Sequence, residues 1–341
     1  MDTAGLNDRI AAAARAIDPE STLRRVWPLL GGSAAQVLAC EVVLADGQAR
    51  KYVVRTPSAY RRSRHADAAW REFSVIRAIH DTGLPRATSR DLPVPEPRDL
   101  PLAESRGLSR ADSRGLPVQR PCHLEPLTPD NPAPFYLLEY CDGQPDLAPA
   151  DVPGHLLQYA TALANLHRLD WRSLNLPFLP TLDLAATART VNTPRMRVEE
   201  IRRALHTPPA QARANPPVLC HCDFWPGNLL WRGGQLAAII DWEECAIGEP
   251  LFDLALARLD LLWILGHAAV ADFTRIYQNL TGVNLCNLPY WDLAVSLRPI
   301  AGIEDWAKTY PDLGRPDVTC ETMTRDHGEF VEQALHRWPP A

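Results

Sequence analysis

The segment from His221 to Asn228 reads His-Cys-Asp-Phe-Trp-Pro-Gly-Asn, and it carries side chains that could do chemistry together. Thirteen residues later, Asp241 follows an apolar run in Ile-Ile-Asp-Trp-Glu. Phosphoryl transfer from ATP needs a base that orients the attacking hydroxyl and two oxygen ligands that hold Mg²⁺ against the phosphates. In this pattern Asp223 is the candidate base, while Asn228 and Asp241 are the candidate metal ligands.

The residues around this segment predict that the two candidate metal ligands lie close together. Two short apolar strands, a turn and a buried strand are expected at 217–220, 229–231, 232–235 and 236–240. The resulting hairpin places Asn228 at the start of one strand and Asp241 at the end of its partner. Taken singly, each fragment is an ordinary turn or cap sequence. The order and spacing of all the fragments together support the catalytic interpretation.

The joint pattern, His-x-Asp-x4-Asn followed by an aspartate that ends a strand, resembles the catalytic core of the protein-kinase-like fold. Because Asp-Trp-Glu stands where protein kinases have Asp-Phe-Gly, the chain is most similar to the aminoglycoside phosphotransferase family. The resemblance implies an α+β, bilobal fold. A small β-rich N-terminal lobe is expected at residues 1–140, and a larger, mostly helical C-terminal lobe at 141–341. It also implies ATP and Mg²⁺ as cofactors and a small-molecule hydroxyl as the phosphate acceptor.

The same resemblance indicates how the nucleotide phosphates are held. Arg55 ends the third expected strand, where protein kinases carry a phosphate-binding lysine, and many members of the resembled family carry arginine there. Glu72, on the following helix, is the expected partner of that cation. A guanidinium can bridge two phosphate oxygens, although its geometry differs from that of an ammonium. Lys51 lies on the same strand face and is the competing anchor. The alternative is an exposed Arg55 and a surface Glu72 without a role in the site.

Two further segments are expected to contact the nucleotide. Gly31, Gly32 and Ser33 could form a short phosphate-covering loop, although a plain turn is an equally good interpretation. Glu139 and Tyr140 lie in the sequence Leu-Glu-Tyr-Cys-Asp-Gly, which resembles the hinge of the family. By this resemblance, backbone groups of the hinge receive the adenine.

Three residues near this site are expected to be structural. His221 would orient the catalytic loop by hydrogen bonding, and His167 would pack at the end of a helix. Asp253, in Glu-Pro-Leu-Phe-Asp-Leu, falls where the resembled family has an acidic residue. Cys220 and Cys222 flank the loop, and we expect them to pack as small buried residues, because no second cysteine pair offers the usual zinc spacing.

Length and composition restrict the class of protein. The 341 residues suffice for two lobes with separate cores, and 46% of the residues are apolar. No uninterrupted apolar stretch approaches the ~18 residues of a membrane span, and the N-terminal residues lack a signal pattern. We therefore expect a cytoplasmic protein with no membrane partner. A net charge of −6 argues against nucleic-acid binding by bulk electrostatics.

The pattern of apolar residues predicts the elements on either side of the site. A helix, three strands, a second helix and a fourth strand are expected at 7–17, 23–30, 37–44, 49–56, 64–82 and 135–140. C-terminal helices are expected near 156–167, 251–265, 267–281, 288–298 and 322–338. Strands, helix and strand followed by many helices is the order of a kinase-like chain.

An octapeptide repeat interrupts this order at residues 89–120. Four copies carry Arg at 90, 98, 106 and 114 and Leu at 92, 100, 108 and 116. One leucine in each unit cannot form a packed core, so the repeat predicts a largely disordered insertion at about 86–130. A docking role for the repeat is an alternative.

These observations favour an ATP-dependent kinase of a small-molecule hydroxyl. A pseudokinase that binds nucleotide without transfer is an alternative, and so is a scaffold that acts through the repeats. The acceptor is open among aminoglycosides, macrolides, sugars, choline-like alcohols and homoserine. A polycationic aminoglycoside would favour an acidic cleft, to which six residues could contribute: Glu243, Glu244, Glu249, Asp260, Glu304 and Asp305. The Trp-rich C-terminal lobe mildly favours a bulky, partly apolar acceptor.

Overall fold

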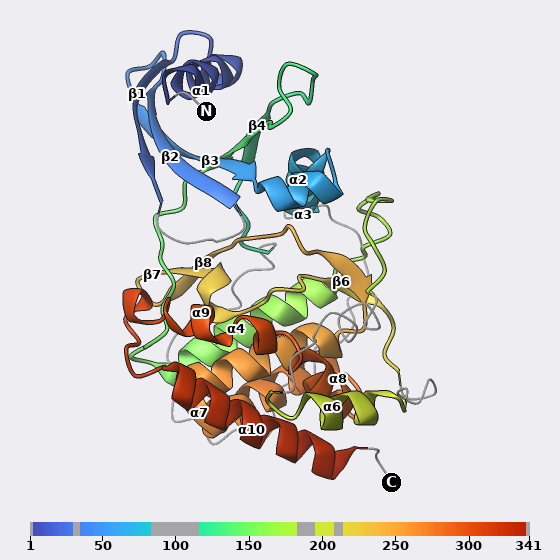
Figure 1. Cartoon of the computed structure of the whole chain (residues 1–341). Helices are drawn as coiled ribbons and strands as arrows, with labels where there is room; N and C mark the ends of the chain where they lie inside the picture. Colours follow the sequence, from blue (N-terminus) through green and yellow to red (C-terminus); the bar gives the residue numbers. More distant parts are fainter. Residues whose placement is uncertain (1–2, 30–34, 83–115, 183–194, 208–213, 339–341) are drawn as a thin grey trace.

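The computed structural model describes residues 3–29, 35–82, 116–182, 195–207 and 214–338 (Figure 1). The predicted phosphate-covering residues Gly31, Gly32 and Ser33 lie outside these ranges, and so do residues 89–115 of the repeat. The described chain folds into a β-rich N-terminal part and a helical C-terminal part, as expected for an α+β bilobal protein.

The N-terminal part is built on an antiparallel sheet of five strands in the order β1-β2-β3-β5-β4. The strands are β1 (Thr22–Pro28), β2 (Ala35–Val43), β3 (Ala49–Pro57), β4 (Pro121–Leu124) and β5 (Tyr136–Glu139). Because neighbouring residues of a strand point to opposite faces, β3 serves two cores. Tyr52 and Val54 pack in the core that includes Ile10 of helix α1 (Thr3–Ile17). Val53 packs in the core that includes Phe73 of helix α3 (Ala68–Thr82).

The structure corrects two boundaries in this part. The helix expected at 64–82 begins only at Ala68, as α3, because His65 is extended and ends a separate short helix, α2 (Ala59–Arg64). The insertion expected at about 86–130 is too wide, since β4 lies within it and Leu116 is buried. The chain rejoins the fold where the amide of Ile239 donates a 2.7 Å hydrogen bond to the carbonyl of Pro117.

The C-terminal part contains helices and two short antiparallel ribbons, which lie on the side facing the sheet (Figure 1). The helices are α4 (Val152–His167), α6 (Val198–Leu205), α7 (Leu251–Thr281), α8 (Leu288–Val295), α9 (Ile303–Ala307) and α10 (Cys320–Arg337). The ribbons pair β6 (Val218–Cys220) with β9 (Ala246–Gly248), and β7 (Leu229–Arg232) with β8 (Gln235–Ile239).

Helix α7 runs through the centre of the helical part. It joins the two helices expected at 251–265 and 267–281 across a kink at Gly266, which has a φ of 80° and a ψ of −178°. Among the described residues it is the one helix long and apolar enough to cross a membrane, and 67% of its apolar window is buried inside the protein. Tyr159 of α4 packs against Phe273 of α7, with ring centroids 4.8 Å apart. This burial is typical of a core helix.

Candidate active site

The loop after β6 brings the predicted base and the first predicted metal ligand together. The side-chain amide of Asn228 donates to Oδ2 of Asp223 at 2.9 Å and to the carbonyl oxygen of the same residue at 2.9 Å. The loop is tight: a Cβ on Gly227 would lie 2.1 Å from the ring of Trp225, so only glycine fits there. Asn228 and Asp223 are therefore held in a fixed relative position.

The second predicted metal ligand lies beside this loop, as the hairpin predicts. The amide of Ile240 donates to the carbonyl oxygen of Asn228 at 2.9 Å, and Asp241 follows directly. Asp241 and Cys222 are non-glycine residues in the left-handed region, with φ of 67° and 64°. Such conformations cost energy and persist only where the surrounding structure fixes them, which is often the case at functional sites.

Arg55 joins the two lobes at this point. Its Nε lies 3.1 Å from Oε1 of Glu72, and its Nη2 lies 2.5 Å from Oδ1 of Asp241. Burial alone would lower the pKa of Arg55, but the nearby carboxylates hold it well above its ordinary value. Lys51 lies elsewhere, 3.6 Å from Asp142 and over the ring of Tyr140. Of the two competing cations, Arg55 is the one that the structure places between Glu72 and Asp241.

A second layer of charge surrounds this pair, and the sequence alone did not indicate it for the nucleotide site. Glu243 lies 3.5 Å from Arg55 and 3.3 Å from Arg61 of α2. Arg61 also pairs with Glu244. Burial, with the charges of Asp241 and other neighbouring carboxylates, raises the pKa of Glu243 to about 7. Helix α2, which Ser58 caps, is the element that presents Arg61 to the C-terminal lobe.

The predicted hinge connects β5 to the C-terminal lobe. The amide of Glu139 donates to the carbonyl oxygen of Arg120 at 2.8 Å, and the amide of Tyr140 donates to that of Lys51 at 3.1 Å. The amide of the next residue, Cys141, forms no hydrogen bond with another described residue. Cys141 was not among the predicted site residues, although it stands in the hinge motif.

Asp253, at the start of α7, accepts hydrogen bonds from the backbone of the loop that carries Asp223. Its Oδ2 accepts a 2.7 Å hydrogen bond from the amide of His221, and its Oδ1 accepts a 2.8 Å bond from that of Cys222. His221 in turn places its ring Nε2 3.0 Å from the carbonyl oxygen of Ile240. A buried carboxylate that receives two backbone amides fixes the loop that carries Asp223.

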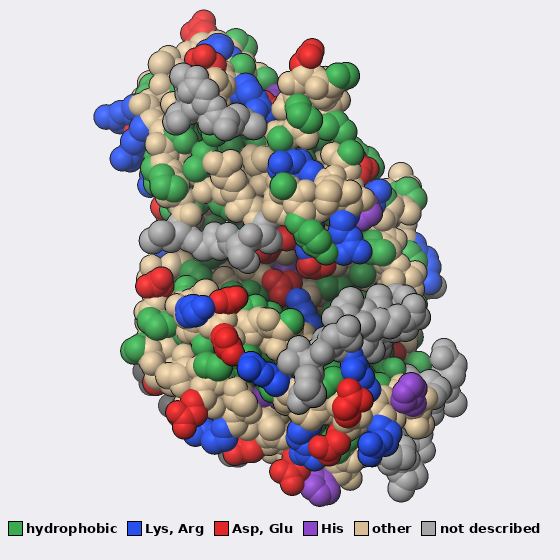
Figure 2. All heavy atoms as spheres, viewed as in Figure 1, with side chains coloured by type: hydrophobic (Ala, Val, Ile, Leu, Met, Phe, Trp, Pro, Cys, Tyr) green, Lys and Arg blue, Asp and Glu red, His purple; other side chains and the backbone are tan. Residues whose placement is uncertain are grey.

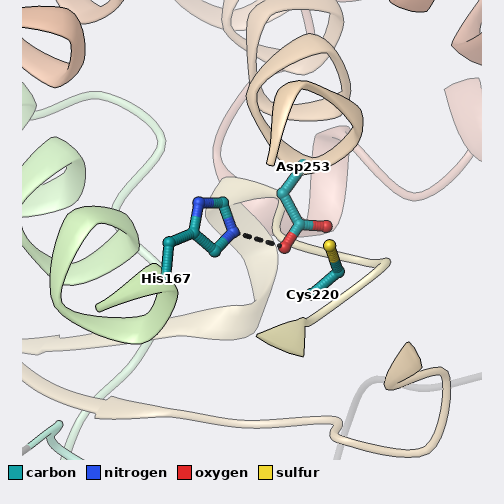
Figure 3. Close-up of side chains that lie close together, drawn as sticks. All are labelled: His167, Cys220 and Asp253. Atoms are coloured by element: carbon teal, nitrogen blue, oxygen red, sulfur yellow. Dashed lines mark hydrogen bonds and ion pairs between the residues drawn. The ribbon is translucent and has the colours of Figure 1, made fainter. Parts of the chain in front are cut away.

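His167, Cys220 and Asp253 lie close enough to suggest a metal site, since their ligand atoms fall within 4.8 Å of one another (Figure 3). However, the imidazole already contacts Asp253 at 3.1 Å through Nε2 and the hydroxyl of Tyr277 at 2.6 Å through Nδ1. A hydrogen bond with Cys222 and burial raise the pKa of the Cys220 thiol well above its ordinary value. These three buried side chains therefore pack against the loop, as expected.

An arginine that the sequence did not single out lies on the other side of Asp223. Nη2 of Arg298 is 3.2 Å from Oδ1 of Asp223, and its Nη1 donates to the carbonyl oxygen of Cys222 at 3.1 Å. Arg298 follows α8 in Ser-Leu-Arg-Pro, a sequence without a recognisable motif. Asp260 of α7 is close to both groups. Burial, with the charge of Asp223, raises the pKa of Asp260 to about 8.

These groups lie where the two lobes face each other. Figure 2 shows the surface hollowed between the lobes, with acidic and basic side chains side by side in the hollow. The two aspartates, the asparagine and the buried arginine are the kinds of side chain that phosphoryl transfer requires.

Comparison with known proteins identifies the family and the fold. Residues 38–294 match the family model described as "Phosphotransferase enzyme family". Among solved structures, the GDP complex of wild-type aminoglycoside 2'-phosphotransferase-IIIa is 14% identical, with a TM-score of 0.58 over 97% of this chain and 99% of that one. Macrolide 2'-phosphotransferase from Brachybacterium faecium is 18% identical, with a TM-score of 0.55 over 99% of each chain. These likenesses show a common protein-kinase-like fold.

Curated relatives match a shorter part of the chain. Acyl-CoA dehydrogenase family member 11 of Homo sapiens is 27% identical over 207 residues, and that of Pongo abelii is 26% identical over 208 residues. Each match covers 50% of this chain and 26% of the relative, so the chain spans about a quarter of the length of these relatives. The family match covers residues 38–294, which include all the described site residues up to Asp260. The chain therefore belongs to the phosphotransferase enzyme family and is similar in fold to the aminoglycoside and macrolide phosphotransferases.

Proposed function

We propose that this phosphotransferase uses ATP and Mg²⁺ to phosphorylate a hydroxyl group of a small molecule. The arrangement of Asp223, Asn228, Asp241 and Arg55 at the junction of the lobes carries this proposal. The similar structures include complexes with GDP and ADP, which supports a nucleotide as the phosphate donor.

The side chains at the junction fit a hard divalent cation. The side-chain nitrogen of Asn228 donates to Asp223, so its side-chain oxygen, Oδ1, is directed elsewhere. Oδ1 of Asp241 accepts from Arg55, while Oδ2 forms no hydrogen bond with another described residue. Carboxylate and amide oxygens are the ligands that Mg²⁺ prefers. When bound, the metal would neutralise charge on the phosphates.

The transfer step then follows from the positions of the protein groups. Asp223 orients the acceptor hydroxyl and takes its proton as the acceptor oxygen bonds to the γ-phosphorus. The bond between that phosphorus and the β–γ bridging oxygen breaks, and ADP leaves with the electron pair. Arg55 provides positive charge for the phosphates, and Glu72 holds it in place. At the hinge, we expect the free amide of Cys141 to receive the adenine.

A nucleotide-binding pseudokinase is the main competitor. Its support is the arginine at position 55 in place of lysine, but the structure gives Arg55 the acidic partners expected of the phosphate anchor. The acceptor could also be a metabolite, since a choline/ethanolamine kinase family protein from Mesorhizobium loti shares the fold, with 17% identity and a TM-score of 0.53.

Replacement of Asp223 by asparagine tests the proposal. We expect Asp223→Asn to bind ATP as the wild type does but to lower turnover about 10²-fold or more, because a positioned base is lost. ATP consumption is measured against a panel of hydroxylated metabolites and antibiotics, with Asp312→Asn as the control at an exposed position. Near-normal turnover of Asp223→Asn on an accepted substrate would remove Asp223 from this role.

A further inference from the structure

The acidic residues that could have attracted a polycationic acceptor are already engaged in the structure. Five of the six have a partner: Glu243 and Glu244 pair with Arg61, Glu249 with Asn215, Glu304 with Arg195 and Asp305 with Lys308. Only Asp260 has no such partner among the described residues, and its raised pKa keeps it largely protonated near neutral pH. None of these six side chains is therefore an unpaired carboxylate ion that could attract a polycationic acceptor.

The charge that stands next to the base is positive instead. Arg298 contacts Asp223, and their side chains remain 26% and 31% exposed, so both are partly accessible to solvent. A guanidinium has five N–H donors. Arg298 uses one on Asp223 and one on the carbonyl oxygen of Cys222, which leaves three for an incoming molecule.

The backbone that carries Arg298 is fixed by buried contacts. Nε2 of His327, on α10, lies 2.8 Å from the carbonyl oxygen of Ser296. The hydroxyl of Ser296 donates to the carbonyl oxygen of Asp292 at 2.7 Å, and Asp292 itself forms a buried ion pair with Arg258. Contacts with α7, α8 and α10 thus hold the segment, and the hydrogen bonds to Asp223 and Cys222 hold the guanidinium of Arg298 beside the base.

We propose that Arg298 determines the class of acceptor, and that it selects a molecule whose hydroxyl lies near a carboxylate. Arg298 orients Asp223 through one N–H group and binds the acceptor carboxylate through the others, in the forked geometry that guanidinium and carboxylate share. The same charge repels ammonium groups, so polycationic aminoglycosides and choline are poor acceptors. This inference rests on the proposed phosphotransferase activity and specifies its substrate class.

The test compares a carboxylate probe with its uncharged counterpart. Binding of glycolate and of methyl glycolate to the protein loaded with ADP and Mg²⁺ is followed by ligand-observed NMR. The proteins are the wild type, Arg298→Met, Arg298→Lys and the control Arg195→Met, whose arginine pairs with Glu304 at an exposed position. We expect glycolate to bind at least about tenfold more tightly than its ester, because a hydrogen bond between two charged groups is stronger than one between a charged and a neutral group. Arg298→Met should lose this preference, Arg298→Lys should keep part of it, and Arg195→Met should retain it.

A second measurement links binding to turnover. 3-Hydroxybutyrate, choline and kanamycin are tested at equal concentration. Only 3-hydroxybutyrate should make the wild type consume ATP faster than it does when no acceptor is added. Arg298→Met should raise the KM for that acceptor while the KM for ATP stays within about twofold.

Three results would overturn the inference: no preference of the wild type for glycolate over the ester, the same preference in Arg298→Met, or faster ATP consumption with kanamycin or choline. Failure of the wild type to bind ADP or ATP with Mg²⁺ would instead count against the proposed function itself.

Discussion

At the scale of single residues, the excess of carboxylates around Arg55 explains why the site should attract a divalent cation. The guanidinium of Arg55 lies within 3.5 Å of three carboxylates, those of Glu72, Asp241 and Glu243. Of these three, Glu243 also pairs with a second cation, Arg61. The cluster has more carboxylates than guanidinium groups, and burial together with the neighbouring carboxylates raises the pKa values of Glu72 and Glu243. A bound Mg²⁺ would compensate the charge that Arg55 alone cannot.

Substitutions at Arg55 should therefore separate phosphate binding from the rest of catalysis. Arg55→Ala should raise the apparent KM for ATP and lower kcat, whereas Arg55→Lys should keep much of the activity, because an ammonium there restores the commoner kinase arrangement. Glu72→Gln should show a milder form of the Arg55→Ala defect. Initial-rate kinetics with varied ATP measure these effects. Lys51→Ala serves as the matched control, since Lys51 pairs with Asp142. A crippled Lys51→Ala beside a normal Arg55→Ala would move the phosphate anchor to Lys51.

The residues that could be predicted from the sequence are those with a fixed local spacing. The places of Asn228 and Asp241 follow from one hairpin, and Glu72 follows from the order of strand and helix. Arg298 could not be found in this way, because it meets Asp223 from 75 positions away in the chain. The loop residues Gly31 to Ser33 remain a prediction, since they lie outside the described part of the chain.

At the scale of elements, the periodicity of apolar residues predicted the long strands and helices. A short strand and a break between two helices were not predicted. Strands β2 and β3 fall within about two residues of the expected ranges, because their apolar alternation is regular. Strand β4 was missed, because it is short and lies within the expected insertion. The break between α2 and α3 at His65 has no glycine or proline to indicate it.

The kink of α7 gives a prediction at this scale. Gly266 adopts a φ of 80° and a ψ of −178°, a conformation that is essentially restricted to glycine. Gly266→Ala should therefore lower the free energy of unfolding by about 1–3 kcal/mol. Gly328 is the control, because it lies inside α10 and a methyl group there would meet no atom within 4 Å. Gly328→Ala should raise the free energy of unfolding by about 0.5–1 kcal/mol. Urea unfolding measures both, and equal effects of the two substitutions would contradict the assigned kink.

At the scale of the whole molecule, one hydrophobic core spans both lobes, and a smaller core lies within the N-terminal lobe. One core lies between α1 and the sheet, and the other extends from α3 through the helical part. A backbone contact joins the lobes where the amide of Ile239 donates to the carbonyl oxygen of Pro117 at 2.7 Å. The site groups therefore lie at a junction that the larger core spans, and ligands that bind the folded protein there should add to its stability.

The raised pKa of Asp260 predicts a pH-dependent stability. Below about pH 4 the carboxyl is protonated in both states and contributes nothing. Between about pH 4 and its folded-state pKa of about 8, the unfolded chain has released the proton that the folded protein retains, so the free energy of unfolding falls as pH rises. Asp260→Asn removes this loss. Because Asp260 keeps some contact with solvent, we expect the variant to gain about 1 kcal/mol on the wild type between pH 5 and pH 8. Urea unfolding at both pH values checks this, and a difference that does not change with pH would contradict it.

The central claim is that Asp241 holds a metal ion against the phosphates of ATP, and calorimetry tests it most directly. ATP is titrated into the wild type and Asp241→Ala, with and without Mg²⁺, and Asp312→Ala is the surface control. We predict that Mg²⁺ strengthens ATP binding to the wild type and the control by about tenfold or more, because the cation compensates the carboxylates around the phosphates. Asp241→Ala should lose this dependence. An Asp241→Ala protein in which Mg²⁺ strengthens ATP binding as much as in the wild type would contradict the claim.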